Sequence, residues 1–247
     1  MTQFYIDINA DVGEGVGNEA KLMPLISSCN IACGGHVGDL RSMTTIVKLA
    51  KLQNVKIGAH PSFPDKLNFG RVIMKLSDAH LFDSLKSQIE SLQSVLSNEE
   101  DVKLNHIKPH GALYNLAAKD ETTSKVIIDV IKSLSLPIKL YAPYNSILSN
   151  LGIQQNIEVV FEAFADRNYN DDLSLVSREN SNAILHKNDV VLSHVLGIVK
   201  QGKVTSINGV EVLIKANTIC VHGDTENALG ILDYLNTNLI RNGIKII

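Results

Sequence analysis

Short apolar runs that end in His, Asp or Glu recur along the whole chain, and helical patterns separate them. Strand-like runs are expected near residues 4–11, 30–34, 55–60, 104–109, 138–142, 157–164 and 218–222. Apolar residues at helical spacing fill most of the gaps, over 39–53, 77–96, 122–134, 144–151, 189–201 and 225–242. Strands that alternate with helices predict a parallel sheet with right-handed crossovers.

The polar ends of these runs favour a closed sheet over an open one. In an open doubly wound sheet, ligand-binding residues gather at one switch point. Here they follow strands along the whole chain, which suits a ring whose strand ends all face one mouth. We therefore predict an α/β fold with one domain over 1–247, an irregular (β/α) TIM-like barrel of about seven parallel strands. Asn208-Gly209 within a β-branched stretch predicts a small β-hairpin near 204–214.

The stretch 105–115, Asn-His-Ile-Lys-Pro-His-Gly-Ala-Leu-Tyr-Asn, carries the strongest functional signal. A strand places alternate side chains on one face, so His106, Lys108 and His110 would point the same way. Burying them is costly unless they hold a ligand or a reacting group. A half-exposed strand with a polar outer face would explain this stretch alone. It does not explain why similar endings recur elsewhere.

The other polar endings combine His, Asp, Asn or Glu with nearby Gly or Pro. Asp7, Asn9 and Asp11 share one face of the first run. The endings cover residues 6–14, 30–39, 57–65, 162–167 and 220–225.

Charge and hydropathy exclude several classes of partner. The formal net charge is −3 and Lys and Arg form no block, which argues against nucleic acid or an anionic membrane as a partner. No run approaches a membrane span, and the N-terminal residues read directly as a strand rather than a signal peptide. We therefore expect a cytoplasmic protein.

Six segments together resemble the signature segments of the LamB/YcsF lactam-utilisation family, in order and across essentially the whole chain. The segments are 7–14, 30–39, 57–65 with Phe69-Gly70-Arg71, 106–115, 164–169 and 221–225. The resemblance implies a barrel related to glycoside hydrolases and polysaccharide deacetylases. It also implies an enzyme that opens the lactam of 5-oxoproline to L-glutamate, with ATP as cosubstrate, in a complex with 5-oxoprolinase subunits B and C.

Such a reaction needs acid–base groups and cations for developing negative charge. We expect His36, His60, His110 and His222 to serve as acids or bases, with Lys108 and Arg167 as anion clamps. Four carboxylates would orient histidines or bind a cation, namely Asp7, Asp11, Asp166 and Asp224. Glu162 and Asp39 are weaker candidates, because a buried carboxylate also serves as a structural cap. The expected catalytic residues are Asp11, His36, His60, Lys108, His110, Asp166, Arg167 and His222. The expected substrate-binding residues are Asp7, Asn9, Glu14, Asn30, Asn115 and Asp224.

The sequence has no recognised motif for a nucleotide or a metal site. There is no GxxxxGK[ST] loop, and the glycine-rich stretch 13–17 lacks the surrounding fingerprint. Asp11 and two histidines would suit a divalent metal, although their spacing is not a recognised ligand motif. Two alternatives stay open: a stand-alone metal-dependent amide or N-acetyl hydrolase, and a non-catalytic subunit that only binds the lactam.

Overall fold

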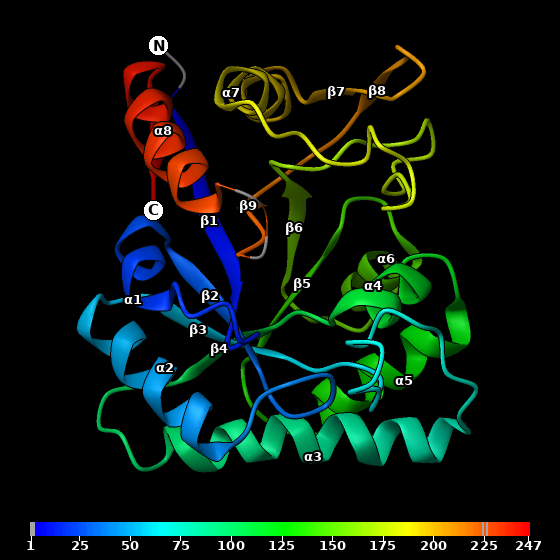
Figure 1. Cartoon of the computed structure of the whole chain (residues 1–247). Coiled ribbons are helices and arrows are strands. Elements are labelled where there is room, and N and C mark those ends of the chain that lie inside the picture. Colours follow the sequence, from blue (N-terminus) through cyan, green and yellow to red (C-terminus); the bar gives the residue numbers. More distant parts are fainter. Residues whose placement is uncertain (1–2, 224, 226) are drawn as a thin grey trace.

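Seven parallel strands close into a ring in the part of the chain that the computed structural model describes, residues 3–223, 225 and 227–247 (Figure 1). The ring strands are β1 (Phe4–Val12), β2 (Ser28–Ala32), β3 (Lys56–His60), β4 (Leu104–Ile107), β5 (Lys139–Pro143), β6 (Val159–Phe164) and β9 (Thr218–Cys220). β9 pairs with both β6 and β1, which closes the barrel. The predicted barrel is confirmed.

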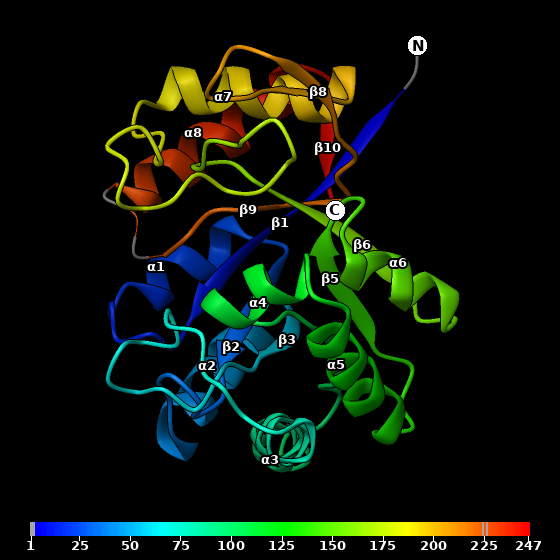
Figure 2. The ribbon, with the colours of Figure 1, turned by 90° about the vertical axis from the view of Figure 1, so that its right-hand side faces the viewer.

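Helices surround the ring (Figure 2). They are α1 (Glu19–Leu22), α2 (Leu40–Leu52), α3 (Asp78–Leu96), α4 (Gly111–Ala117), α5 (Glu121–Ser133), α6 (Ile147–Gln154), α7 (Asn188–Leu196) and α8 (Ala228–Arg241). A 3-10 turn, η1 (Met23–Leu25), follows α1, and a π turn, η2 (Gly197–Gln201), extends α7. No helix among the described residues is both long enough and apolar enough to cross a membrane.

Side-chain caps explain where several helices begin. Asp39 and Ser42 form a reciprocal capping box at the start of α2, and Ser77 caps α3. The last helix was expected from residue 225 but begins at Ala228. Asn227 has a φ of 63°, outside the helical region, and the Thr225 hydroxyl bonds to Asp166 instead of the helix. The short helices α1 and α4 were not predicted.

Three further strands lie outside the ring. β7 (Lys203–Thr205) and β8 (Glu211–Leu213) form the predicted antiparallel hairpin, with Gly209 at a φ of 80° in the turn. β10 (Ile244–Ile246) pairs in parallel with the first residues of β1 and was not predicted. Its three residues are too few for alternation to be recognised.

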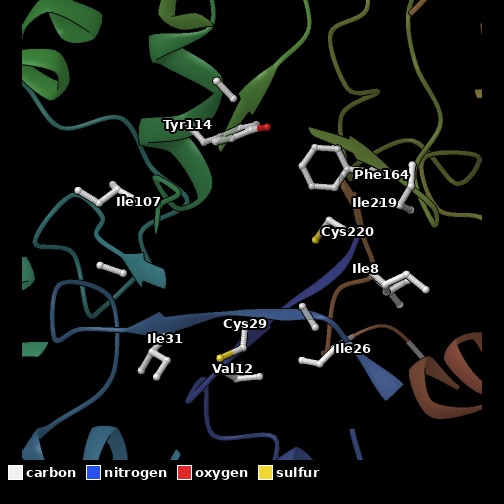
Figure 3. Close-up of a cluster of buried hydrophobic side chains, with 14 of the residues drawn as sticks. Ile8, Val12, Ile26, Cys29, Ile31, Ile107, Tyr114, Phe164, Ile219 and Cys220 are labelled. Carbon is white, nitrogen blue, oxygen red and sulfur yellow. The ribbon is translucent and has the colours of Figure 1, made fainter. Parts of the chain in front are cut away.

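Polar side chains fill the inside of the barrel, and the apolar core lies around it. Along β1, Ile6, Ile8 and Ala10 are completely buried on the face that carries the apolar core. Figure 3 shows Ile8 beside Ile219 of β9 in this core, whereas Ile31 of β2 lies in another part of the same cluster. The residues between these apolar positions point into the barrel, where they form a hydrogen-bonded network. Successive side chains of each strand thus lie alternately in the apolar core and in the polar interior.

Glycine at position 58 makes room for this network. A Cβ atom on Gly58 would overlap the imidazole ring of His106 on the neighbouring strand. That ring stacks on Tyr141, with 3.8 Å between the ring centroids, and its Nε2 lies 2.7 Å from the Asn30 side-chain oxygen. His106 is therefore a buried structural residue in the barrel interior.

Candidate active site

A pocket of about 290 Å³ opens where the strands of the ring end. Its size is near the lower end of small-molecule sites. Eight of the sequence-predicted residues line it: Asp11, Glu14, His60, Lys108, His110, Asn115, Arg167 and His222. Strand ends from opposite sides of the ring therefore converge on one cavity, as parallel barrels require.

Lys108 lines the pocket and is 2 % exposed. Its Nζ lies 2.9 Å from Asp11 Oδ1 and 2.9 Å from Glu162 Oε1. Burial would lower the pKa of Lys108, but the negative charges, led by Asp11, outweigh burial and hold it well above its ordinary value. Burial would likewise raise the pKa of Asp11, whereas His60 and Lys108 hold it well below the usual range. Lys108 is thus a fixed, buried cation.

Glu14 and three histidines form a second cluster beside Lys108. His60 Nε2 lies 3.0 Å from His110 Nδ1, and Glu14 Oε1 lies 3.3 Å from the same His110 nitrogen. His36 stacks on His110, with 3.7 Å between centroids, and its Nε2 lies 3.0 Å from Glu14 Oε1. Burial lowers the pKa of His36 to about 4. Burial would also lower the pKa of His60, but Asp11 outweighs it and raises that pKa.

A glycine fixes the position of His110. Gly111 has a φ of 54°, and a Cβ atom there would lie 2.7 Å from the carbonyl oxygen of Gly70. Only glycine therefore allows the loop around Gly70 to approach the start of α4 so closely. The same loop supplies the Phe69 carbonyl oxygen, which lies 3.0 Å from His110 Nε2. The Pro-His-Gly sequence thus sets the orientation of the His110 ring.

His222 and Asp166 form a separate pair on the other side of the pocket. His222 Nδ1 lies 3.0 Å from Asp166 Oδ1, and Asp166 is completely buried. Burial would raise the pKa of Asp166, but the neighbouring His222 and Thr225 outweigh it and lower that pKa. A buried carboxylate in this position fixes the tautomer and orientation of an imidazole. Because Asp166 engages Nδ1, a contact between His222 and a molecule in the pocket would use Nε2.

Three arginines line the same pocket, Arg71, Arg167 and Arg178, which we call the arginine wall. Arg167 is 5 % exposed, and its guanidinium donates to the carbonyl oxygens of Val176 and Ala183, at 2.6 and 3.3 Å. Burial lowers the pKa of Arg167, and the positive charges of Arg178 and Arg71 lower it further. Guanidinium groups that line one pocket favour the binding of an anion there.

Five of the other predicted site residues lie behind or below the pocket lining. His36 and Asp166 hold Glu14 and His222 from behind. Asn9 and Asn30 belong to the interior network, where the Asn30 amide donates to Asn9 and Asp11 at 2.8 Å each. Asp7 lies deepest: it accepts from Ser28 and Thr218 and pairs with Lys56 at 3.1 Å. The sixth, Asp224, lies outside the described residues.

Sequence reasoning did not assign several residues of the pocket. Glu162 was a doubtful candidate, yet its Oε2 accepts from the Tyr114 hydroxyl at 2.7 Å and its Oε1 pairs with Lys108. Arg71 stands in a quoted signature segment but had no role. Arg178 lies in an aperiodic loop, where no pattern could have identified it. Asp39, the other doubtful carboxylate, is a helix cap.

Comparison with known proteins identifies the family. The model of the LamB/YcsF family matches residues 6–247, nearly the whole chain. The chain belongs to the LamB/YcsF family. The family expected from the sequence is therefore confirmed.

Relatives of this LamB/YcsF chain have informative names. A protein from Haemophilus influenzae (strain PittEE), named as the A subunit of 5-oxoprolinase, is 41% identical over 241 residues, which cover 98% of each chain. The crystal structure of a lactam utilization protein from Thermus thermophilus is 32% identical with a TM-score of 0.90, over 98% of each chain. A GH18 chitinase from Flavobacterium johnsoniae is 10% identical with a TM-score of 0.50, covering 98% of this chain and 96% of that one, and shares the fold alone.

Proposed function

We propose that this chain opens the lactam ring of 5-oxoproline to give L-glutamate, as one component of an ATP-hydrolysing 5-oxoprolinase. The observation that carries the proposal is the composition of one small pocket. The arginine wall, the buried cation Lys108 and the His222–Asp166 pair all face the same cavity. A relative that is 41% identical over nearly the full length is named as the A subunit of 5-oxoprolinase, which supports the same reaction.

The arginine wall suits the carboxylate of 5-oxoproline. The substrate is a five-membered lactam with one carboxylate, so it offers one anionic group and one neutral amide. Guanidinium groups bind carboxylates through paired hydrogen bonds. A carboxylate held by Arg178 and Arg71 would direct the ring toward Lys108 and the histidines on the pocket floor.

Lys108 and His222 would act on the amide. The amide oxygen would carry a negatively charged phosphoryl group when water attacks, and a buried ammonium stabilises such charge more than an exposed one does. His222 would remove a proton from the attacking water and return it to the ring nitrogen as the C–N bond breaks. Asp166 would stabilise the imidazolium that forms between these two steps.

ATP would make the unstrained amide reactive. Transfer of the γ-phosphoryl group to the amide oxygen gives a phosphorylated imidate, which water attacks more readily. Once the C–N bond breaks, the opened ring is left as an acyl phosphate. A second water then hydrolyses this acyl phosphate, so the products are L-glutamate, ADP and phosphate. The chain has no GxxxxGK[ST] loop. We therefore propose that subunits B and C supply the nucleotide site. We also propose that the complex works in the cytoplasm.

A glutamate-release assay on the complex reconstituted with subunits B and C tests this assignment. His222→Ala should lower kcat by about 100-fold or more, the loss of a general acid–base group. Arg178→Ala should raise KM with little change in kcat, because it removes binding common to substrate and transition state. His80→Ala and His186→Ala are matched controls, since both histidines are exposed and lie outside the pocket. Wild-type kcat in His222→Ala would rule out the proposed acid–base role.

A further inference from the structure

The rings of His60 and His110 are both held by backbone carbonyl groups on their outer sides. His60 Nδ1 lies 2.7 Å from the carbonyl oxygen of Lys108, and His110 Nε2 lies 3.0 Å from that of Phe69. A carbonyl oxygen only accepts hydrogen bonds, so these outer nitrogens carry the ring protons. In the neutral rings the inner nitrogens, His60 Nε2 and His110 Nδ1, therefore carry lone pairs.

These two lone pairs face each other and two carboxylate oxygens. The inner nitrogens are 3.0 Å apart. Glu14 Oε1 lies 3.3 Å from the His110 nitrogen and 3.8 Å from the His60 nitrogen. Asp11 Oδ2 lies 3.4 Å from the His60 nitrogen. Four electron-pair donors thus converge, and only a cation among them can satisfy all four.

We propose that Glu14, His60 and His110 bind a divalent transition-metal ion such as Zn²⁺, with Asp11 as the adjacent oxygen ligand. A single added proton on one imidazole satisfies only part of this set, whereas a metal ion accepts every lone pair at once. The three ligand-to-ligand distances, 3.0, 3.3 and 3.8 Å, also have the right size. A tetrahedral ion with bonds of about 2.1 Å has ligands about 3.4 Å apart.

The residues behind the ligands have the arrangement that metal sites require. Metal-binding histidines donate their other ring N–H to a carbonyl or carboxylate, and metal-binding carboxylates are held by further hydrogen bonds. His60 and His110 meet the first condition. His36 Nε2, 3.0 Å from Glu14 Oε1, and Lys108 Nζ, 2.9 Å from Asp11 Oδ1, meet the second.

The site also opens to the pocket, because Glu14, His60 and His110 all line it. Catalytic zinc sites keep a position for water, whose pKa the ion lowers, and they can expand from four ligands to five, so an ion held by these residues and Asp11 would still reach water in the pocket. A second group, Asp11, Cys220 and His222, has metal-like spacing, but the buried Lys108 ammonium already contacts two of its members. Lys108 Nζ donates to Cys220 Sγ at 3.1 Å and lies 2.9 Å from Asp11 Oδ1.

Isothermal titration of the chelator-treated full chain with ZnCl₂, without substrate or ATP, tests the site directly. We expect one ion per chain. His60→Ala and His110→Ala should each weaken binding by at least about 100-fold, while His80→Ala stays within a few-fold of wild type. Glu14→Gln keeps the volume of the side chain and should weaken binding by more than about 10-fold, so the test holds even if a histidine variant misfolds.

Co²⁺ substitution distinguishes the two clusters. A site made of imidazole and carboxylate gives d–d absorption without the intense near-ultraviolet charge-transfer band of a cobalt–thiolate bond. That band, or loss of binding in a Cys220→Ser variant, would place the ion at the Cys220 group and overturn the assignment. Failure to bind Zn²⁺ at micromolar concentrations would overturn it as well, and would mean that a proton on one of the imidazoles is the cation in this cluster. Either result leaves the lactamase proposal intact, because binding is measured without turnover.

Discussion

Lys108→Met should destabilise the fold strongly, because it removes the only cation within 3 Å of two buried carboxylates among the pairs that the structure describes. Methionine matches the length of lysine without its charge. Glu162, which is 1 % exposed, would lose its paired cation, and Asp11, which is 8 % exposed, would keep the more distant His60 at 3.4 Å. Breaking a buried ion pair by removing one partner costs about 3–5 kcal/mol. For a chain of this size, that corresponds to a fall in Tm of roughly 6–20 °C.

Thermal unfolding followed by circular dichroism measures this fall. Lys51→Met is the matched control, since Lys51 is 41% exposed and its pair with Glu99 spans 3.3 Å. An exposed pair contributes under about 1 kcal/mol, so its Tm should move by no more than a few degrees. The double variant Lys108→Met/Glu162→Gln should recover about 1–3 kcal/mol, since it also removes one unpaired charge. Equal Tm values for Lys108→Met and Lys51→Met would refute the buried-cation reasoning.

Three further outcomes follow from the geometry. Gly58→Ala should cost about 1–3 kcal/mol of unfolding free energy in a urea titration, because the new methyl group overlaps the His106 ring; an unchanged midpoint would contradict this. Asp166→Asn should lower Tm at neutral pH, and the Tm values of variant and wild type should converge below about pH 4. The pKa of Asp166 is lowered in the folded chain, so its carboxylate contributes stability above the pKa of the unfolded chain, and this stability is lost as the pH falls through the folded pKa. Hydrogen exchange should slow in the loops after Glu14, His60 and Asp166 when subunits B and C are added, and unchanged exchange there would argue against docking at the mouth.

Strand period and polar strand ends were enough to predict the barrel. Six of the seven ring strands combine an apolar run with a His, Asp, Asn or Glu near the end, and β5 is the exception, so a single sequence carries both signals for most of the ring. The elements α1, α4 and β10, of 4, 7 and 3 residues, are too short for a repeating pattern to be recognised, and they were missed. Their positions depend on tertiary pairing, as for β10 against the first residues of β1.

Only part of the site was predicted. Alternation shows which face of a strand a residue lies on, but it does not show how deep in the barrel the residue lies. Asp7, Asn9 and Asp11 share a face, as expected, but four residues of strand separate Asp7 from Asp11 by about 13 Å. Only Asp11 therefore reaches the pocket, while Asp7 bonds to Ser28 and Thr218 deeper in the barrel. Arg178 shows the opposite limit: an aperiodic loop brings it to the pocket without a local signal.

Glutamate release from 5-oxoproline and ATP, measured for three samples side by side, tests the central claim most directly. The samples are the isolated chain, the chain with subunits B and C, and the same complex carrying His222→Ala. We predict no release from the isolated chain, full release from the wild-type complex, and a loss of about 100-fold or more in the variant complex. Full-rate, ATP-driven release from the isolated chain, or from the variant complex, would contradict the account.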